Sequence, residues 1–204
     1  MIFFTSDTHF CHEKIIAYTK RPFTSVDQMN QTIIKNWNSI VKKDDLVYHL
    51  GDFAFRYNMK ILEDLRKQLN GHIILIAGNH DRSDYNKLEN FEYITMTKSR
   101  GIKTYPICRI TYGTQKIMLC HYAMRVWDQS HRGTWHLYGH SHGNLTDDPN
   151  SLSFDVGVDC HNFTPLSFDR VAEIMKTKTF KPVTNHSSRE ELSLLLDNTA
   201  SLLS

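Results

Sequence analysis

The chain has 204 residues, of which 40% are hydrophobic, an ordinary composition for one globular domain with a large core. Its 24 basic and 22 acidic residues leave a formal charge of only +2, which excludes a strongly basic surface for non-specific nucleic-acid binding. A nucleic acid is therefore expected only as a local substrate contact. The first apolar run is short and lacks a preceding basic segment, and no later run is long enough to cross a bilayer, so we expect no membrane attachment. Four widely spaced cysteines without a CxxC pair favour a reducing, cytoplasmic location.

Strands and helices alternate in the first part of the chain. Strands are predicted at residues 1–6, 45–50 and 72–77, and helices at 26–41 and 59–69. The first helix has a capping box of Ser25 and Gln28, and the second is closed by Asn70 and Gly71. This order is typical of an α/β domain.

Strands follow one another in the second part of the chain. They are predicted at 105–112, 116–120, 135–138, 153–158 and 170–176, with a hairpin turn at 112–115. Alternation followed by hairpins favours an α/β domain with mixed sheets over a purely parallel sheet.

The chain is predicted to divide into a domain at 1–182 and a C-terminal segment at 183–204. The segment begins as a polar linker and continues as an amphipathic helix that carries Leu192, Leu195 and Leu196. This helix is expected either to pack on the domain or to form a homo-oligomer contact.

Five short polar clusters each follow an apolar run. They are Asp7-Thr8-His9, Gly51-Asp52, Gly78-Asn79-His80-Asp81, His121 and Gly139-His140-Ser141-His142. Because ligands gather beyond the carboxyl ends of strands in α/β sheets, we expect the clusters to converge on one site. Their Asp, Asn and His side chains suit two divalent transition metals that share one carboxylate.

In the same order, these clusters resemble the D-x-H, G-D, G-N-H-D/E, H and G-H-x-H blocks of the calcineurin-like metallophosphoesterase superfamily. The resemblance runs from residue 3 to about 160. The members that the chain resembles are small, single-domain proteins of prokaryotic or phage type. It implies a sandwich of two mixed β-sheets flanked by helices (αββα), with metals at the sheet ends. It also implies two ligand sets: Asp7, His9, Asp52 and His142 for one ion, and Asn79, His121, His140 and the shared Asp52 for the other.

The resemblance and the residue types together predict in-line attack on phosphorus by a metal-bridging hydroxide. Asp52 is the expected bridge, because a neutral amide cannot offer two anionic oxygens. The resemblance assigns His80 to the leaving-group side of the substrate. Asp81 is expected either to orient the His80 ring or to cap a following helix. Manganese is favoured as the metal, and iron, nickel, cobalt or zinc would suit the same donors.

Candidate substrate contacts lie outside these clusters. His12 is expected to reach the phosphate or to pack behind the metals, and Arg56 and Arg82 to bind phosphate oxygens or to form surface ion pairs. Residues 125–136 mix aromatic and basic side chains between two ligands, which predicts a loop over the site. In that loop Trp127, His131 and Arg132 are expected to shape the pocket, although Trp127 would equally serve to pack the loop down.

A late cluster of Asp155, Asp159 and His161 is expected to bond to the ligand histidines or to stabilise turns, not to hold a third metal.

The predicted function is hydrolysis of phosphodiester bonds, in a small phosphoester or nucleotide-like substrate, by two metal ions. The enzymatic alternatives are a small-molecule phosphomonoesterase and a nucleotide pyrophosphatase. The alternative of another class is a protein-binding scaffold with a structural metal site, docked through the C-terminal helix.

Overall fold

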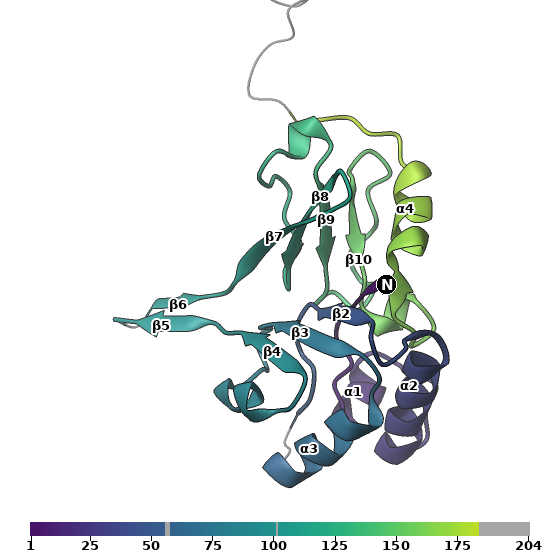
Figure 1. The fold of residues 1–204 in the computed structure, drawn as a ribbon. Helices are drawn as coiled ribbons and strands as arrows, with labels where there is room; N and C mark the ends of the chain where they lie inside the picture. The colour runs from purple at the N-terminus through teal and green to yellow at the C-terminus, as the bar shows by residue number, and fades with distance from the viewer. Residues whose placement is uncertain (56–57, 101, 184–204) are drawn as a thin grey trace, which may run out of the picture.

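Two β-sheets stacked face to face form the centre of the fold in the computed structural model, which describes residues 1–55, 58–100 and 102–183 (Figure 1). The first sheet has the order β11-β1-β2-β3-β4, and the second the order β10-β9-β8-β7. The first comprises β1 (Ile2–Thr5), β2 (Leu46–His49), β3 (His72–Ile76), β4 (Phe91–Ile94) and β11 (Leu166–Ser167). The second comprises β7 (Ile107–Tyr112), β8 (Gln115–Cys120), β9 (Trp135–Tyr138) and β10 (Ser153–Asp155).

Each sheet is mixed. Strands β1 to β4 are parallel, and β11 runs antiparallel to β1 at the edge. In the second sheet β8, β9 and β10 are parallel, and β7 is antiparallel to β8. A separate ribbon of β5 (Thr97–Ser99) and β6 (Ile102–Thr104) projects away from both sheets (Figure 1).

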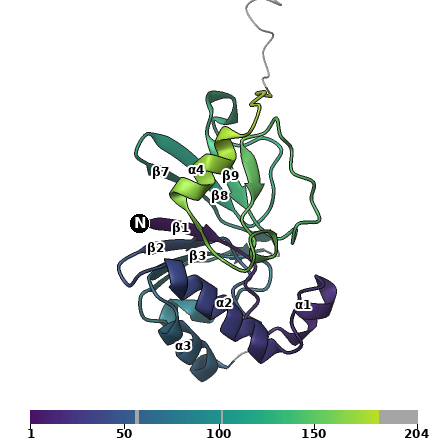
Figure 2. The same ribbon diagram turned by 90° about the vertical axis from the view of Figure 1, so that its right-hand side faces the viewer.

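Helices cover the outside of the sandwich. They are α1 (Glu13–Tyr18), α2 (Val26–Ile40), α3 (Met59–Gln68) and α4 (Phe168–Lys176), with 3-10 turns η1 (Ser83–Lys87), η2 (Ser130–Arg132) and η3 (Val158–Cys160). Helices α2 and α3 lie on the side of the first sheet that faces away from the second, and α4 lies against the second sheet (Figure 2). None of the helices in the described part of the chain has both the length and the apolar character that a bilayer crossing requires.

The core consists of two apolar clusters, one on each face of the first sheet. Because side chains alternate along a strand, Phe3 packs under the helices with Trp37, while its neighbour Phe4 packs between the sheets with Leu119. A strand that is buried on both faces reads as a continuous apolar run, which is how β1 and β3 read in the sequence.

The predicted α/β sandwich of mixed sheets with flanking helices is confirmed. Both predicted helices form, and Ser25 Oγ accepts the N–H of Gln28 at 3.2 Å as a capping residue should. The predicted hairpin joins β7 to β8, with Tyr112 opposite Gln115.

The predicted strand at 170–176 is wrong, because these residues form α4. Val171 and Met175 are four residues apart and both buried, the spacing of a helical face, and Ser167 caps the helix by accepting the N–H of Arg170 at 3.2 Å. The strand expected at 153–158 ends at Asp155, where the chain turns into η3. Five helices and strands of the described residues have no counterpart among the predicted elements: α1, β4, β5, β6 and β11. The predicted C-terminal helix falls in 184–204, outside the described residues.

Candidate metal centre

The loops after β1, β2, β3, β8 and β9 meet at one edge of the sandwich. Backbone bonds tie them to each other: Asp7 N donates to Gly51 O, His9 N to Asp52 O and Gly139 N to His121 O, each at 3.0 Å. All seven predicted metal ligands come together there. Two groups of donor atoms form, Asp7 with His9 and His142, and Asp52 with His121 and His140, and within each group the donors lie within 4.8 Å of one another.

Asp52 joins the two groups. Its Oδ2 lies 3.5 Å from His9 Nε2 in the first group and 3.6 Å from His121 Nε2 in the second. Asn79 belongs to the second group, since its Oδ1 lies 3.0 Å from His121 Nε2. In the first group Asp7 Oδ1 lies 3.8 Å from His9 Nε2 and 3.9 Å from His142 Nε2.

The other polar atom of several ligands is fixed by the protein. His121 Nδ1 donates to Leu50 O at 2.7 Å, which turns Nε2 toward the centre. Asp7 Oδ2 accepts the N–H of His140 at 2.8 Å, and Asp52 Oδ1 accepts the N–H of His80 at 2.9 Å. In Asp7 and in Asp52, one carboxylate oxygen therefore binds a loop N–H while the other faces the metal centre.

Five of the proposed ligands have a left-handed backbone conformation, which is uncommon outside glycine. Their φ angles are 57° at Asp7, 49° at His9, 57° at Asp52, 68° at His140 and 48° at His142. Such conformations cost on the order of 1 kcal/mol each and tend to cluster at functional sites.

Two glycines permit the close approach of the loops. A Cβ at Gly78 would collide with Asp52 Oδ1, and a Cβ at Gly139 would collide with the side chains of Ser6 and Asp7. This explains physically why glycine precedes Asn79 and His140 in the two clusters.

The donor set fits divalent cations. Asp7 Oδ1 and His9 Nε2 are buried without a hydrogen-bond partner although both face the centre, which is unfavourable unless a cation binds there. Burial raises the pKa of Asp7 to about 8 and also raises that of Asp52, and a cation bound between them would favour the ionised form of both carboxyls. Burial lowers the pKa of His9 and His121, and the neutral imidazole is the form that binds metals.

A buried Arg21 supports the first donor group. Its guanidinium binds both carboxylate oxygens of Asp159 at 2.8 Å and donates to the carbonyls of Asp7 at 2.7 Å and Thr8 at 3.0 Å. Asp159 Oδ2 in turn accepts from His142 Nδ1 at 2.7 Å, as the sequence analysis expected for the late cluster. Asp155 instead binds Ser141 and Gly157, and is therefore a turn contact. Nothing in the sequence identified Arg21, because an isolated arginine in a loop gives no signal.

His80 lies at the open side of the centre. Its side chain is 40% exposed, and its Nε2 is 4.0 Å from Asp52 Oδ2. His12 is buried behind it, with Nδ1 3.2 Å from Nδ1 of His9. Tyr122, which the sequence analysis missed, donates to Asn79 Oδ1 at 3.4 Å and packs against His140; its position next to His121 was the only signal.

Asp81 has neither of the two expected roles. Its carboxylate accepts backbone N–H groups from Asp52 at 2.7 Å, Phe53 at 2.9 Å and Gly78 at 2.8 Å, and no described contact joins it to the His80 ring. The following η1 turn has Arg82, not Asp81, at its N-cap. Asp81 thus fixes the Asp52 loop against the Gly78 loop. Burial raises its pKa to about 6, and the neighbouring charge of Asp52 acts in the same direction.

The segment at 125–136 does not reach the centre, contrary to the expectation. Trp127 is buried, its indole donates to Thr134 O at 2.8 Å, and its ring packs on His136, so it holds the loop down. The described residues that line the cavity beside the centre do not include Trp127, His131, Arg132 or Arg82. Arg56 lies outside the described residues.

A cavity of about 330 Å³ adjoins the donors. Its lining combines His9, Asp52, Asn79, His80, His140 and His142 with His12, Lys14, Ile15, Tyr18 and Phe55.

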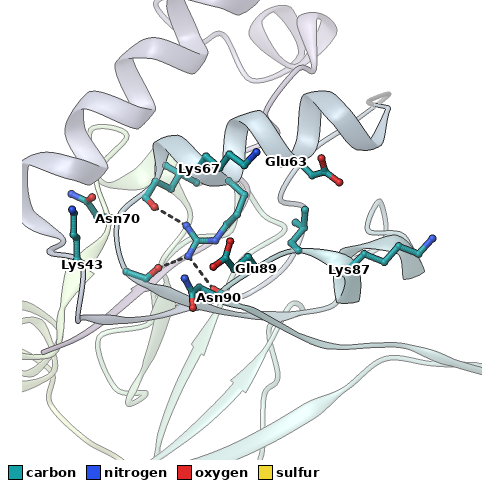
Figure 3. A pocket seen from close by; sticks show the side chains of 11 residues that line it. Lys43, Glu63, Lys67, Asn70, Lys87, Glu89 and Asn90 are labelled. Carbon is teal, nitrogen blue, oxygen red and sulfur yellow. Dashed lines mark hydrogen bonds between the residues drawn. The ribbon is translucent and has the colours of Figure 1, made fainter.

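A second cavity, of about 400 Å³, lies where the parallel strands begin, at the opposite end of the first sheet from the metal donors. Figure 3 shows the side chains that line it. Arg66 lies in its wall and donates to the carbonyls of Leu69, Gly71 and Asn90. These bonds join the end of α3 to the starts of β3 and β4, so the role of Arg66 is structural.

Similarity to known proteins is clear. The profile of the calcineurin-like phosphoesterase superfamily domain matches residues 1–156. The uncharacterised protein MJ1445 of Methanocaldococcus jannaschii is 35% identical over 181 residues, which cover 86% of this chain and 91% of that protein. The Gene 66 protein of Mycobacterium phage L5 is 34% identical over 80 residues, 38% of each chain. A protein of unknown function from Aquifex aeolicus, AQ665, has a similar fold, with a TM-score of 0.62 at 22% identity over 85% of this chain and 98% of that one.

Proposed function

The chain belongs to the calcineurin-like phosphoesterase superfamily, and from this premise we propose that it hydrolyses phosphodiester bonds with two divalent metal ions. One observation carries the proposal: Asp52 Oδ2 lies between two donor groups, and two buried atoms of the first group, Asp7 Oδ1 and His9 Nε2, lack any hydrogen-bond partner. A purely structural cluster of Asp and His side chains would satisfy these atoms within the protein.

Asp7, His9, His142 and Asp52 would hold one ion, and Asn79, His121, His140 and Asp52 the other. When bound, the ions neutralise charge on the phosphoryl oxygens and lower the pKa of a coordinated water. Manganese is our preferred metal, since it suits the carboxylate and amide oxygens of Asp7, Asp52 and Asn79.

The protein's own groups supply positioning and proton transfer. His80 is half-exposed at the cavity, 4.0 Å from Asp52, which suits a group that donates a proton to the leaving oxygen or stabilises its charge. His12, buried against His9, would restrain the ring of that ligand. Asp81 is a positioning residue, because its three backbone bonds hold the loop that carries Asp52.

The lining of the cavity supports a diester over a monoester. It includes Lys14, Tyr18 and Phe55 in addition to the metal donors and His80, and these residues would face the second ester group that a diester has and a monoester lacks. Its volume of about 330 Å³ lies within the range of small-molecule sites and supports a small or nucleotide-like substrate.

The decisive experiment uses metal-stripped protein reloaded with Mn²⁺, and compares bis(p-nitrophenyl) phosphate with p-nitrophenyl phosphate. We expect faster diester turnover that disappears in Asp52→Asn together with the bound metal. Asp44→Asn, at an exposed turn position, is the matched control and should retain both. Preference for the monoester would replace the diester proposal by the phosphomonoesterase alternative. Bound metal without turnover of either ester would favour the scaffold alternative.

His80→Ala separates chemistry from metal binding. We expect the variant to bind the same amount of metal while its kcat falls by a factor on the order of 10² to 10⁴, the range for loss of a general acid. Normal turnover in this variant would refute the role proposed for His80.

A further inference from the structure

We propose that the first helix, α1, and Phe55 form a binding site for a planar aromatic group attached to the substrate phosphate, with Tyr18 as its stacking surface. This inference rests on the proposed function, since it assigns a substrate class to the cavity beside the metal donors. The loop at 125–136, one of the places where substrate contacts are expected from the sequence, does not line that cavity, whereas His12 does.

The part of the cavity lining that carries no proposed metal donor is largely aromatic. The rings of His12 and Phe55 lie 4.1 Å apart at an interplanar angle of 30°, and Phe55 meets the ring of His80 edge-on at 5.2 Å. Tyr18 meets His12 edge-on at 6.4 Å. Aromatic side chains therefore extend without a break from the proposed proton donor to the mouth of the cavity.

Tyr18 is placed to receive a ligand. It is 69% exposed, although it lines the cavity, so its ring is available to a group that enters. An isolated exposed aromatic residue would need no explanation, but this one continues an aromatic wall beside a candidate catalytic centre. Aromatic platforms of this kind bind bases and other flat rings by stacking.

Lys14 gives the same site a positive charge. Lys14 and Tyr18 are four residues apart in α1 and so lie on one face of the helix, and both line the cavity. A cation beside an aromatic surface selects a ligand that combines a flat ring with an anionic group, such as a nucleoside phosphodiester.

The site is built on a fixed support. Ile15, on the same helix, is buried in the core, and the N–H of Arg21 donates to Ile16 O at 2.9 Å. The same Arg21 binds Asp159 and the carbonyl of Asp7. Tyr18 therefore keeps a defined position relative to the metal donors, as a specificity residue must.

The test compares three diesters that release the same p-nitrophenolate: the thymidine 5′-, phenyl and methyl esters of p-nitrophenyl phosphate. In Tyr18→Ala the ratio of kcat/KM for the thymidine ester to that for the methyl ester should fall by about fivefold to a hundredfold, the range for loss of one stacking partner. Tyr18→Phe should keep the wild-type ratio, because the ring and not the hydroxyl stacks. Tyr112→Ala, at an exposed tyrosine of β7 outside the cavity, is the matched control.

The phenyl ester distinguishes two sources of the aromatic group. If its ratio to the methyl ester falls as well, the site accepts flat rings in general; if only the thymidine ratio falls, the site accepts a nucleobase. An unaltered thymidine ratio in Tyr18→Ala, with active enzyme, overturns the inference and leaves the proposed function intact.

If the wild-type protein hydrolyses none of the three esters, the proposed function fails, and calorimetry then decides the inference alone. Thymidine 5′-phosphate should bind the Mn²⁺-loaded protein more tightly than methyl phosphate does, and Tyr18→Ala should abolish the difference. Equal affinities in the wild-type protein would refute the aromatic site.

Discussion

The imidazole of His142 donates from Nδ1 to Oδ2 of Asp159 over 2.7 Å, while the buried Arg21 donates to both oxygens of the same carboxylate. The bond fixes the ring of a proposed metal ligand with Nε2 turned toward Asp7. Arg21 also holds the backbone of the Asp7 loop, so one buried ion pair orders two ligands that are 135 residues apart in the chain.

Asp159→Asn should weaken metal binding. The amide is isosteric but strengthens the imidazole ligand less than the carboxylate, and loss of such an outer partner typically costs about 10-fold to 100-fold in metal affinity. Competition with a chelator measures the affinity. Asp147→Asn removes an exposed carboxylate that is paired with Lys178 and is the control. Wild-type affinity in Asp159→Asn would mean that the bond does not support the metal site.

His136 should make the stability of the protein sensitive to acid. Its Nε2 accepts the N–H of Met124 at 3.1 Å and its Nδ1 donates to Met118 O at 3.2 Å, so the buried ring fits only in the neutral form. Burial lowers the pKa of His136 from 6.5 to about 4. Between pH 4 and pH 6.5, His136 is therefore protonated in the unfolded chain but neutral in the folded protein.

The free energy of unfolding therefore includes the full contribution of His136 above pH 6.5. It decreases by about 3 kcal/mol as the pH falls from 6.5 to 4. Urea unfolding between pH 4 and 7 should show a smaller pH dependence in His136→Gln, which retains a donor and an acceptor. His72→Gln, at an exposed histidine, controls for the loss of an imidazole. If the unfolding free energy of His136→Gln changed with pH as that of the wild type does, His136 would not be the source of the acid sensitivity.

Gly139→Ala should disrupt the metal centre. The added Cβ would collide with the side chains of Ser6 and Asp7, so the loop that carries His140 must shift. We expect loss of bound metal, measured by elemental analysis after dialysis. Gly113→Ala, in the hairpin turn, has open space around its Cβ and a φ of +58°, so it should cost on the order of 1 kcal/mol of stability and no metal. Full metal content in Gly139→Ala would show that the loops tolerate the displacement.

Trp127→Ala should reduce stability much more than catalysis. The buried indole packs on His136 and binds Thr134 O, and truncation of a buried Trp costs about 3–5 kcal/mol. The kcat/KM for bis(p-nitrophenyl) phosphate should stay within about twofold of wild type at a temperature where the variant is folded, because the residue lies outside the cavity. A large loss of activity without a loss of stability would show that the loop at 125–136 contacts the substrate after all.

Local sequence patterns predicted the elements that have one clear period and a clear end. The helix at Val26–Ile40 has an amphipathic face and a capping serine, and the strands that precede the ligands are short apolar runs. The strand predicted at 170–176 is wrong, because the spacing of Val171 and Met175 and the Ser167 cap fit a helix. Helix α1, with six residues, is too short to show a period.

Local sequence patterns were enough to predict an α/β domain whose polar clusters meet, because donors that follow parallel strands lie at one edge of a sheet, and the family resemblance then implied which seven side chains would bind metal. Tertiary structure alone decided which other residues surround them. Arg21, Asp159 and Tyr18 approach the centre through side-chain contacts between segments distant in sequence, and no local pattern encodes such contacts. The two roles expected for Trp127 could not be separated for the same reason: an aromatic side chain between ligands has the same sequence signature whether it faces a substrate or, as here, the protein interior.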